Sequence, residues 1–417
     1  MRIFALTKAR SAKLLTARRA TDRSAERVAA RIVADVRRRG DAALFAWTGR
    51  LDRVSLSSRN LWVSAAEMAR STRCVDKSFL GALAHAARNI RAVARGQLPR
   101  EWAIQTDPGV RVGQIVRPIQ RIGCYIPGGR HSLVSTLLMT VIPAQEAGVR
   151  EIVVTSPQPG DSLLAAAGYL GVRQVARIGG AQAIAALAYG TRSIARVDKI
   201  FGPGNRYVAA AKRLVSADCA IDLLAGPTEA IVLSNDGDPR FIAADLLAQA
   251  EHDPDATALF VTTSAKLGKI VSAEIERQLA QLPRSNPAWR SLASRGAVLV
   301  ASDIPRAIQF VNEFAPEHLT LAGSAGKLID RIDSAASVFV GDASAQSFGD
   351  YLSGTNHTLP TGGVARTRGG LSAADFVKCL SVQEVTAPGF AAMAAATQEL
   401  ARAEGLLAHG LSIEVRK

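Results

Sequence analysis

The sequence predicts an α/β protein with two lobes, each built on a parallel sheet. Strand-like runs alternate with alanine-rich helices in two series, first RIGCYI, EIVVTS, QVARIG and DKIFG, then EAIVLS, ALFVTT, AVLVAS and SVFVG. Strands that alternate with helices form parallel sheets covered on both faces. The length of 417 residues is sufficient for two or three domains with ample cores.

Composition narrows the class of protein. Hydrophobic residues make up 48% of the chain and aromatic residues only 5%, so the cores consist mainly of Ala, Val, Leu and Ile. No apolar run reaches the roughly 18 residues of a membrane span. The four cysteines are far apart and form no CxxC pair, which is typical of thiols in a reducing compartment. The basic first 20 residues resemble a transit peptide, but no cleavage-like apolar segment follows, so we expect a cytoplasmic protein.

The formal net charge of +15 raises the possibility of a nucleic-acid partner. The basic residues are scattered, however, and few aromatic residues lie among them. The densest run, VRRRG at 36–40, falls at an expected helix end, where cations complement the helix dipole. A solvated basic surface is therefore the favoured interpretation, and we expect no nucleic-acid and no membrane partner.

The alternation divides the chain into an expected lobe at about 119–227 and another at 228–345. Residues 22–105 have helical patterns, and we expect this segment to pack on the second of these lobes. After a glycine-rich stretch at 360–372, the tail is predicted to be an amphipathic helix followed by an extended end. A helix so placed packs either on its own chain or on a partner chain.

Three glycine clusters follow expected strands of the first lobe: YIPGGR at 125–130, IGGAQA at 178–183 and FGPGNR at 201–206. Glycines at the carboxyl ends of parallel strands let the backbone approach a phosphate, and the next helix N-terminus favours negative charge. Each cluster alone is also compatible with a tight turn, and none is a GxGxxG or P-loop motif. Three in one lobe indicate a ligand crevice.

The stretch LLAQAEHDP, residues 246–254, contains a candidate metal-binding pair. Asp238 and Pro239 start an expected helix, and Gln249 and His252 then lie one turn apart on one face. This spacing suits two ligands of one metal ion. On this stretch alone, a polar helix end near the surface is the favoured interpretation, because glutamine is an unusual zinc ligand.

Other polar residues are candidates for acid–base chemistry. Glu317 and His318 lie in EFAPEHLTL, where a helix gives way to a strand, and such a junction places both side chains at the mouth of a cleft. Histidine suits proton transfer at neutral pH, and a partly buried glutamate can act as a base. Asp350 is either a loop residue or a site residue, and His409 in the tail is either a surface residue or a ligand.

Several motifs occur in an order that resembles the histidinol dehydrogenase family. They cover nearly the whole chain from about residue 22, and they are YIPGGRHSLVSTLLMTVIPAQEAGV, GGAQAIAALAYGT, KIFGPGNRYVAAAKRLVS, AGPTEAIVL, LLAQAEHDPDA, FAPEHL and GDYLSGTNHTLPTGG. The resemblance implies two incomplete Rossmann-like domains in an intertwined homodimer. The larger domain would comprise 22–118 and 228–369, and the NAD-binding domain 119–227. Residues 1–21 and 370–395 would be dimerisation segments, and residues 396–417 a tail that completes the partner's site.

The resemblance also implies roles for individual residues. Glu317 and His318 would be the acid–base pair. The zinc ligands would be Gln249, His252, Asp350 and His409, with the histidine of the tail supplied by the other subunit. The substrate contacts would be Thr228, Gln249, His252, His318, Asp350, Glu404 and His409. The NAD contacts would be Tyr125, Gln182 and Asn205. This sequence has Thr228 where many members have serine, and RTRGGLS at 366–372 where serine-containing versions are frequent.

The implied reaction is the oxidation of L-histidinol through L-histidinal to L-histidine, the last step of histidine biosynthesis, with two hydride transfers to two NAD molecules. One alternative is a paralogous zinc-dependent alcohol dehydrogenase of the same fold that acts on another small alcohol, such as a sulfonated diol. A basic nucleic-acid-binding protein is the alternative of a different class. It predicts a clustered basic face with interleaved aromatic residues, which the sequence lacks.

Overall fold

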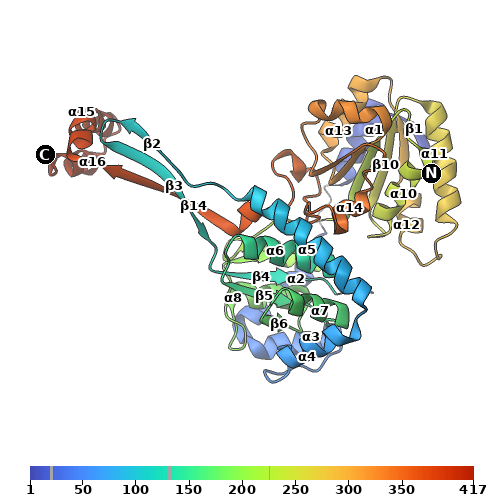
Figure 1. The fold of residues 1–417 in the computed structure, drawn as a ribbon, viewed down its shortest axis with the longest axis horizontal. Helices are drawn as coiled ribbons and strands as arrows, with labels where there is room; N and C mark the ends of the chain where they lie inside the picture. The colour runs from blue at the N-terminus through green and yellow to red at the C-terminus, as the bar shows by residue number, and fades with distance from the viewer. Residues whose placement is uncertain (19–21, 129–132, 225) are drawn as a thin grey trace.

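A computed structural model describes residues 1–18, 22–128, 133–224 and 226–417. It consists of two α/β lobes and a long arm that projects from one of them (Figure 1). The predicted fold class is confirmed, because each lobe contains a sheet whose neighbouring strands are all parallel. Among the described residues, no helix combines the length and the apolar character needed to cross a membrane.

The larger lobe is built on a six-stranded sheet with the order β1-β11-β10-β9-β12-β13. Its strands are β1 (Arg2–Ala5), β9 (Glu229–Leu233), β10 (Thr257–Thr262), β11 (Ala297–Val300), β12 (His318–Leu321) and β13 (Ser337–Val340). Its helices are α1 (Lys8–Ala17), α10 (Pro239–Ala250), α11 (Ala265–Leu279), α12 (Ala288–Ser294), α13 (Ile304–Phe314) and α14 (Gln346–Tyr351). The central strands are almost wholly apolar because both faces of the sheet are buried. Phe260 and Val298 pack in one core, and their neighbours Leu259 and Leu299 pack in another.

The second lobe is built on a five-stranded sheet with the order β6-β5-β4-β7-β8. Its strands are β4 (Arg121–Tyr125), β5 (Glu151–Thr155), β6 (Gln174–Ala176), β7 (Lys199–Phe201) and β8 (Ala220–Ile221). The helices between the strands are α6 (Val134–Glu146), α7 (Asp161–Tyr169), α8 (Gly180–Tyr189) and α9 (Arg206–Val215). All three glycine clusters follow strands of this sheet, at the carboxyl ends of β4, β6 and β7, although residues 129 and 130 of the first cluster lie outside the described residues.

The N-terminal helices pack on this second lobe, and the expectation that they pack on the larger lobe is wrong. They are α2 (Arg23–Arg39), α3 (Asp41–Asp52), α4 (Ala65–Cys74) and α5 (Lys77–Gln97). The apolar stripe of α2, which includes Ile32 and Val36, shares a core with Ile184 and Leu187 of α8. The amphipathic stripe predicted the helix, but such a stripe does not specify which lobe it covers.

The first residues also differ from their expected place. Strand β1 pairs with β11 along its whole length, and Leu14 and Leu15 of α1 pack against the core of the larger lobe. In this chain, therefore, residues 1–18 are part of the larger lobe. In the described part of the chain, three 3₁₀ helices complete the structure: η1 (Gly323–Arg331), η2 (Val364–Arg366) and η3 (Ala373–Phe376).

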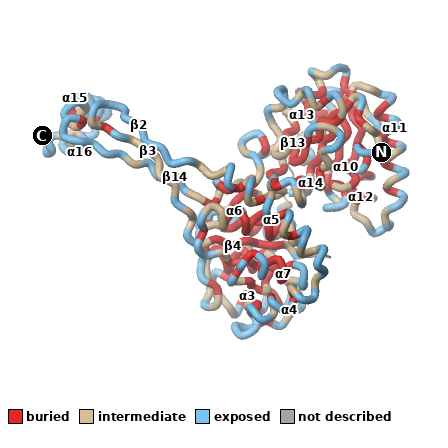
Figure 2. Tube along the Cα trace, viewed as in Figure 1, coloured by how far each residue is buried: buried red, intermediate tan, exposed pale blue. Residues whose placement is uncertain are grey.

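The arm consists of an antiparallel sheet and two terminal helices. Its strands, in the order β14-β3-β2, are β2 (Trp102–Asp107), β3 (Val110–Pro118) and β14 (Val377–Val385), and its helices are α15 (Ala387–Ala403) and α16 (Leu407–Glu414). Helix α16 replaces the extended end that the sequence predicts. Most of the arm is exposed (Figure 2), including large apolar side chains such as Leu407 at 83% and Leu400 at 68%.

Candidate active site

The candidate acid–base pair lies where α13 gives way to β12. Asp303 caps the start of α13, and Ala315 ends the helix in the left-handed conformation with φ of 49°. Pro316 then leads to Glu317 and His318, and β12 begins at His318, in register with Ala230 of β9. Glu317 and His318 are 8% and 3% exposed, so both ionisable side chains are buried at the amino edge of the sheet.

A row of polar contacts runs through this pair. The peptide N–H of Glu229 donates to Oε2 of Glu317 at 3.0 Å, and the same carboxylate oxygen lies 3.8 Å from Nδ1 of His318. On the other side of the ring, Nε2 of His318 lies 3.7 Å from Oδ1 of Asp350. Nε2 of Gln249 in turn donates to Oδ2 of Asp350 at 3.2 Å. Four of the residues that the sequence singled out therefore form one continuous group.

Burial and neighbouring charges set the ionisation of this group. Burial raises the pKa of Glu317 to about 7, although the nearby His318 acts in the opposite direction. Burial by itself lowers the pKa of His318, but the carboxylates of Glu317 and Asp350 outweigh it, so this pKa is raised. For Asp350, burial is outweighed by the nearby imidazole of His318, and the pKa of Asp350 is lowered. A carboxyl group with a pKa near neutrality suits a general base.

Helix α10 brings the candidate metal ligands to the same place. As predicted, Asp238 caps the helix and Pro239 begins it. Gln249 is buried at 1% exposure, and its Oε1 has no hydrogen-bond partner among the described residues. His252 lies just past the end of α10, close enough that its charge acts on Asp350. An unpartnered amide oxygen beside a carboxylate and an imidazole fits a metal site of mixed oxygen and nitrogen donors.

The residues that the family resemblance adds to this set lie elsewhere in the chain. Within the described residues, no three His, Cys, Asp or Glu side chains are arranged to bind a single metal ion. His409 lies on α16 and Glu404 at the end of α15, both exposed, at the far end of the arm from α10 and α14 (Figure 1). The structure therefore does not bring these two residues to the site of their own chain.

Thr228 directly precedes Glu229, the first residue of β9. It is half-buried, and its carbonyl accepts the N–H of Thr257 at 2.8 Å. The next peptide N–H is the donor that holds Glu317. Thr228 therefore lies at the same edge of the sheet as the candidate acid–base pair.

The three candidate NAD residues line one cavity of about 690 Å³ in the second lobe: Tyr125, Gln182 and Asn205. Asn205 caps α9, accepting the N–H groups of Tyr207 and Val208 at 3.0 and 3.2 Å. Gly180 donates its N–H to the Tyr125 hydroxyl at 3.1 Å. Two helix N-termini thus border a cavity large enough for a nucleotide, an arrangement that favours a phosphate.

Close backbone approach explains one of the glycines here. Gly202 has φ of +111°, and a Cβ at this position would lie 2.1 Å from the carbonyl oxygen of Tyr125. Only glycine fits, so the turn after β7 can bring Asn205 beside β4. The requirement of the turn accounts for this glycine without a ligand.

Sequence reasoning missed one wall of this cavity. Arg31 from α2 and Trp47 and Asp52 from the α3 segment line it opposite the glycine turns. Gln182 donates to Asp52 at 3.2 Å, and burial raises the pKa of Asp52. The segment 22–52 showed only a helical packing pattern, which carries no signal that some of its side chains face a ligand.

A second cavity, of about 880 Å³, lies between the lobes. Its lining includes His252 and Tyr351 from the larger lobe and Leu83 and Ser135 from the second lobe. Gly128 lines both cavities, so they adjoin at this residue. The two cavities thus meet at a residue of the first glycine cluster, and the second cavity is lined by His252, one of the candidate metal ligands.

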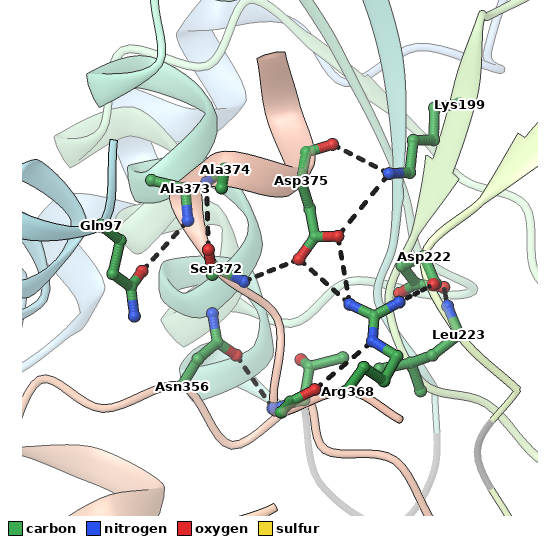
Figure 3. A network of polar contacts seen from close by, with 12 residues as sticks. Gln97, Lys199, Asp222, Leu223, Asn356, Arg368, Ser372, Ala373, Ala374 and Asp375 are labelled. Atoms are coloured by element: carbon green, nitrogen blue, oxygen red, sulfur yellow. Dashed lines mark hydrogen bonds and ion pairs between the residues drawn. The ribbon is translucent and has the colours of Figure 1, made fainter. Parts of the chain in front are cut away.

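The 366–372 loop packs against the second lobe (Figure 3). Arg368 pairs with Asp375 at 3.1 Å and donates to the carbonyl of Asp222. Lys199 of β7 donates to the carbonyl of Asp375 at 2.9 Å. Asp222 also accepts the N–H of Gly202 at 2.7 Å. The loop is therefore fastened to the turn that carries Asn205.

A buried pair of ionisable side chains in one parallel-sheet lobe and a nucleotide-sized cavity in the other fit an enzyme of the α/β class that uses a nucleotide cofactor. Comparisons with known proteins specify the family. The family model for histidinol dehydrogenase matches residues 15–417. Histidinol dehydrogenases from Geobacillus kaustophilus and Escherichia coli are 46% and 44% identical over 392 residues, which cover 92% of this chain and 92% and 89% of those proteins. The chain belongs to the histidinol dehydrogenase family.

A solved structure agrees with this assignment. The crystal structure of histidinol dehydrogenase from Elizabethkingia anophelis superposes with a TM-score of 0.94 at 36% identity, covering 100% of this chain and 98% of that chain. The similarity therefore includes both lobes and the arm. The expected family is confirmed, and with it the expected enzyme class, a dehydrogenase that uses NAD.

Proposed function

We propose that this protein oxidises L-histidinol through L-histidinal to L-histidine, with two NAD molecules as hydride acceptors, as the last step of histidine biosynthesis. The observation that carries the proposal is the continuous group Glu317–His318–Asp350–Gln249 in a chain of this family. A two-step oxidation of an alcohol requires one group that removes a hydroxyl proton and another that activates water. The buried pair supplies both.

A zinc ion would be held by Gln249, His252 and Asp350 of one chain and by a fourth donor from outside it. The unpartnered Oε1 of Gln249 beside Asp350 supports this assignment. When bound, zinc would supply a fixed positive charge that orients the polar groups of the substrate. Tyr125, Gln182 and Asn205 would contact NAD, since all three line the cavity of about 690 Å³.

The protein's own residues then move the protons. His318 accepts the hydroxyl proton at Nε2, the ring nitrogen on the Asp350 side, while the hydride leaves for the nicotinamide. In the second oxidation, the Glu317 carboxylate accepts a proton from the water that adds to the aldehyde. His318 assists again, because its Nδ1 faces Glu317 at 3.8 Å. Thr228 contributes a hydroxyl at the same edge of the sheet.

The arm supplies the fourth ligand in a homodimer. Its exposed apolar side chains, such as Trp102, Ile104 and Leu411, have no cover in their own chain, and a two-fold partner can cover them reciprocally. His409 and Glu404 of one subunit would then complete the zinc and substrate site of the other. On this proposal, the dimerisation elements are β2, β3, β14, α15 and α16.

The ratio of NADH formed to histidinol consumed tests the proposed reaction. The purified protein with histidinol and excess NAD is expected to form two NADH and one histidine for each histidinol. A ratio of one, with histidinal accumulating, would contradict the four-electron reaction. Faster turnover of a sulfonated diol than of histidinol would instead favour a paralogous alcohol dehydrogenase.

A further inference from the structure

A buried ion pair lies directly behind the acid–base pair. Arg18, just past the end of α1, donates through Nε to Oε1 of Glu229 at 2.8 Å and pairs through Nη2 with Oε2. Both side chains are buried, with exposures of 6% and 5%. A two-pronged contact between a planar guanidinium and a carboxylate fixes orientation as well as distance. The two residues are 211 positions apart in sequence, so the pair fixes α1 against the start of β9.

The same guanidinium holds the end of α13. It donates to the carbonyl of Phe314 through Nη1 and to that of Ala315 at 3.5 Å through Nη2, and it lies 3.8 Å from the centre of the Phe314 ring. Ala315 is a non-glycine residue with φ of 49°, a conformation that persists only where its surroundings impose it. Arg18 therefore binds the turn that leads directly into Glu317 and His318.

Glu229 connects the contacts of Arg18 to the proposed acid–base pair through Glu317. Its peptide N–H is the donor to Glu317, and its carboxylate accepts the N–H of Gly362 at 3.2 Å. The residue before it is Thr228. The ion pair of Arg18 with Glu229 thus joins three segments: the turn after α13, the amino end of β9 and the 360–363 loop. The first two of these segments carry Glu317 and the peptide N–H that it accepts.

We infer that Arg18 and Glu229 are positioning residues that hold Glu317, His318 and Thr228 in the geometry needed for proton transfer. The inference rests on the proposed function for its kinetic consequence. Stability alone is a weaker explanation, because a buried ion pair often contributes little more than an apolar pair of similar volume. A displacement of about 1 Å in a reacting group, by contrast, can lower a rate about 100-fold.

The test compares Arg18→Ala, Arg18→Lys and Glu229→Gln with the wild type on histidinol and histidinal. The matched control is Lys13→Ala, because Lys13 is an exposed cation on α1, the helix that ends directly before Arg18. We expect kcat to fall about 10- to 100-fold in Arg18→Ala with KM for histidinol nearly unchanged. Turnover of histidinal is expected to fall at least as much, because that step needs Glu317. Arg18→Lys should lie between, because an ammonium cannot reach both carboxylate oxygens and both carbonyls.

Guanidinium ion at millimolar concentration provides a rescue experiment. Arg18 lines a cavity of about 520 Å³ together with Phe314, so a small cation can enter the space that Arg18→Ala leaves. Saturable recovery of kcat in Arg18→Ala, and none in Lys13→Ala, would support positioning. An unchanged kcat in both Arg18→Ala and Glu229→Gln would overturn the inference, as would losses that merely follow the fraction of unfolded protein.

Hydrogen exchange of the amides of Phe314, Ala315, Glu317 and His318 gives a readout that does not depend on the reaction. Exchange there should be faster in Arg18→Ala and in Glu229→Gln than in Lys13→Ala, because the turn loses its clamp. Absence of histidinol oxidation by the wild type would refute the proposed function. Unchanged exchange at 314–318 in both variants would refute the positioning role separately.

Discussion

At the scale of the residue, the chemistry depends on one carboxyl group placed where water does not reach it freely. Glu317 is buried, and its Oε2 accepts the peptide N–H of Glu229 and lies 3.8 Å from Nδ1 of His318. Burial raises its pKa to about 7, so at neutral pH the group is part base and part acid. A glutamate on the surface would be fully ionised there and a weaker base.

The pH dependence of the aldehyde step follows from this burial. Glu317 acts as a base only when it is deprotonated, and its pKa is raised to about 7. The rate of histidinal oxidation at saturating substrate should therefore be low in acid and rise through about pH 7. The measurement is kcat across a series of buffers of constant ionic strength. A flat profile from about pH 5 to 9 would be incompatible with Glu317 as the base.

The substitution Glu317→Gln separates the two steps. It preserves shape and removes the base, so it should lower histidinal oxidation by about 10²- to 10⁴-fold while affecting the first oxidation less. His318→Asn should impair the first step as well. Single-turnover rates on histidinol and on histidinal provide the comparison. Equal and mild losses on both substrates for Glu317→Gln would remove it from water activation.

At the scale of the element, local patterns predicted more than the packing between segments. Apolar runs separated by helical segments predicted the strands, and Asp238 and Pro239 predicted the start of α10. Assignment of α2 to a lobe failed because its stripe fits any apolar surface of the right width. The sequence did not predict that Arg31 and Trp47 line the nucleotide-sized cavity, because the orientation of these side chains depends on where the helices pack.

The end of α10 carries a prediction about metal content. We expect one zinc per subunit, lost with activity on chelation and restored by added zinc. His252→Ala should lower bound zinc strongly because it removes one of four donors, whereas His85→Ala, an exposed histidine on α5, should retain it. Metal analysis of both purified variants measures the zinc bound per subunit. Full zinc content together with full activity in His252→Ala would refute the assignment.

The turn between β7 and α9 carries a prediction about stability. Lys212 and Asp222 form a buried ion pair, and Asp222 also holds the N–H of Gly202. Asp222→Ala leaves a buried ammonium without its carboxylate, which should lower the free energy of unfolding by about 3–5 kcal/mol. Arg277, whose side chain is 59% exposed and pairs with Glu274, provides the control, since Arg277→Ala should cost at most about 1 kcal/mol. Urea titration measures both, and equal small losses would contradict the account.

At the scale of the whole molecule, the four proposed zinc ligands do not lie together in one chain, and the arm is mostly exposed. Gln249, His252 and Asp350 lie in the larger lobe, while His409 lies at the end of the arm with exposed apolar side chains around it. The sequence left open whether the tail packs on its own chain or on a partner. The structure leaves the arm extended, and the proposed dimer places each tail in the other subunit's site.

Mixing two inactive variants, His252→Ala and His409→Ala, tests this crossed arrangement most directly. In a crossed heterodimer, one site receives both substitutions and the other receives neither. Activity should return under conditions of subunit exchange, to about half of the wild-type value per heterodimer if the sites act independently. If each tail instead served its own chain, every site would carry one substitution. Absence of recovery despite demonstrated exchange would contradict the shared site.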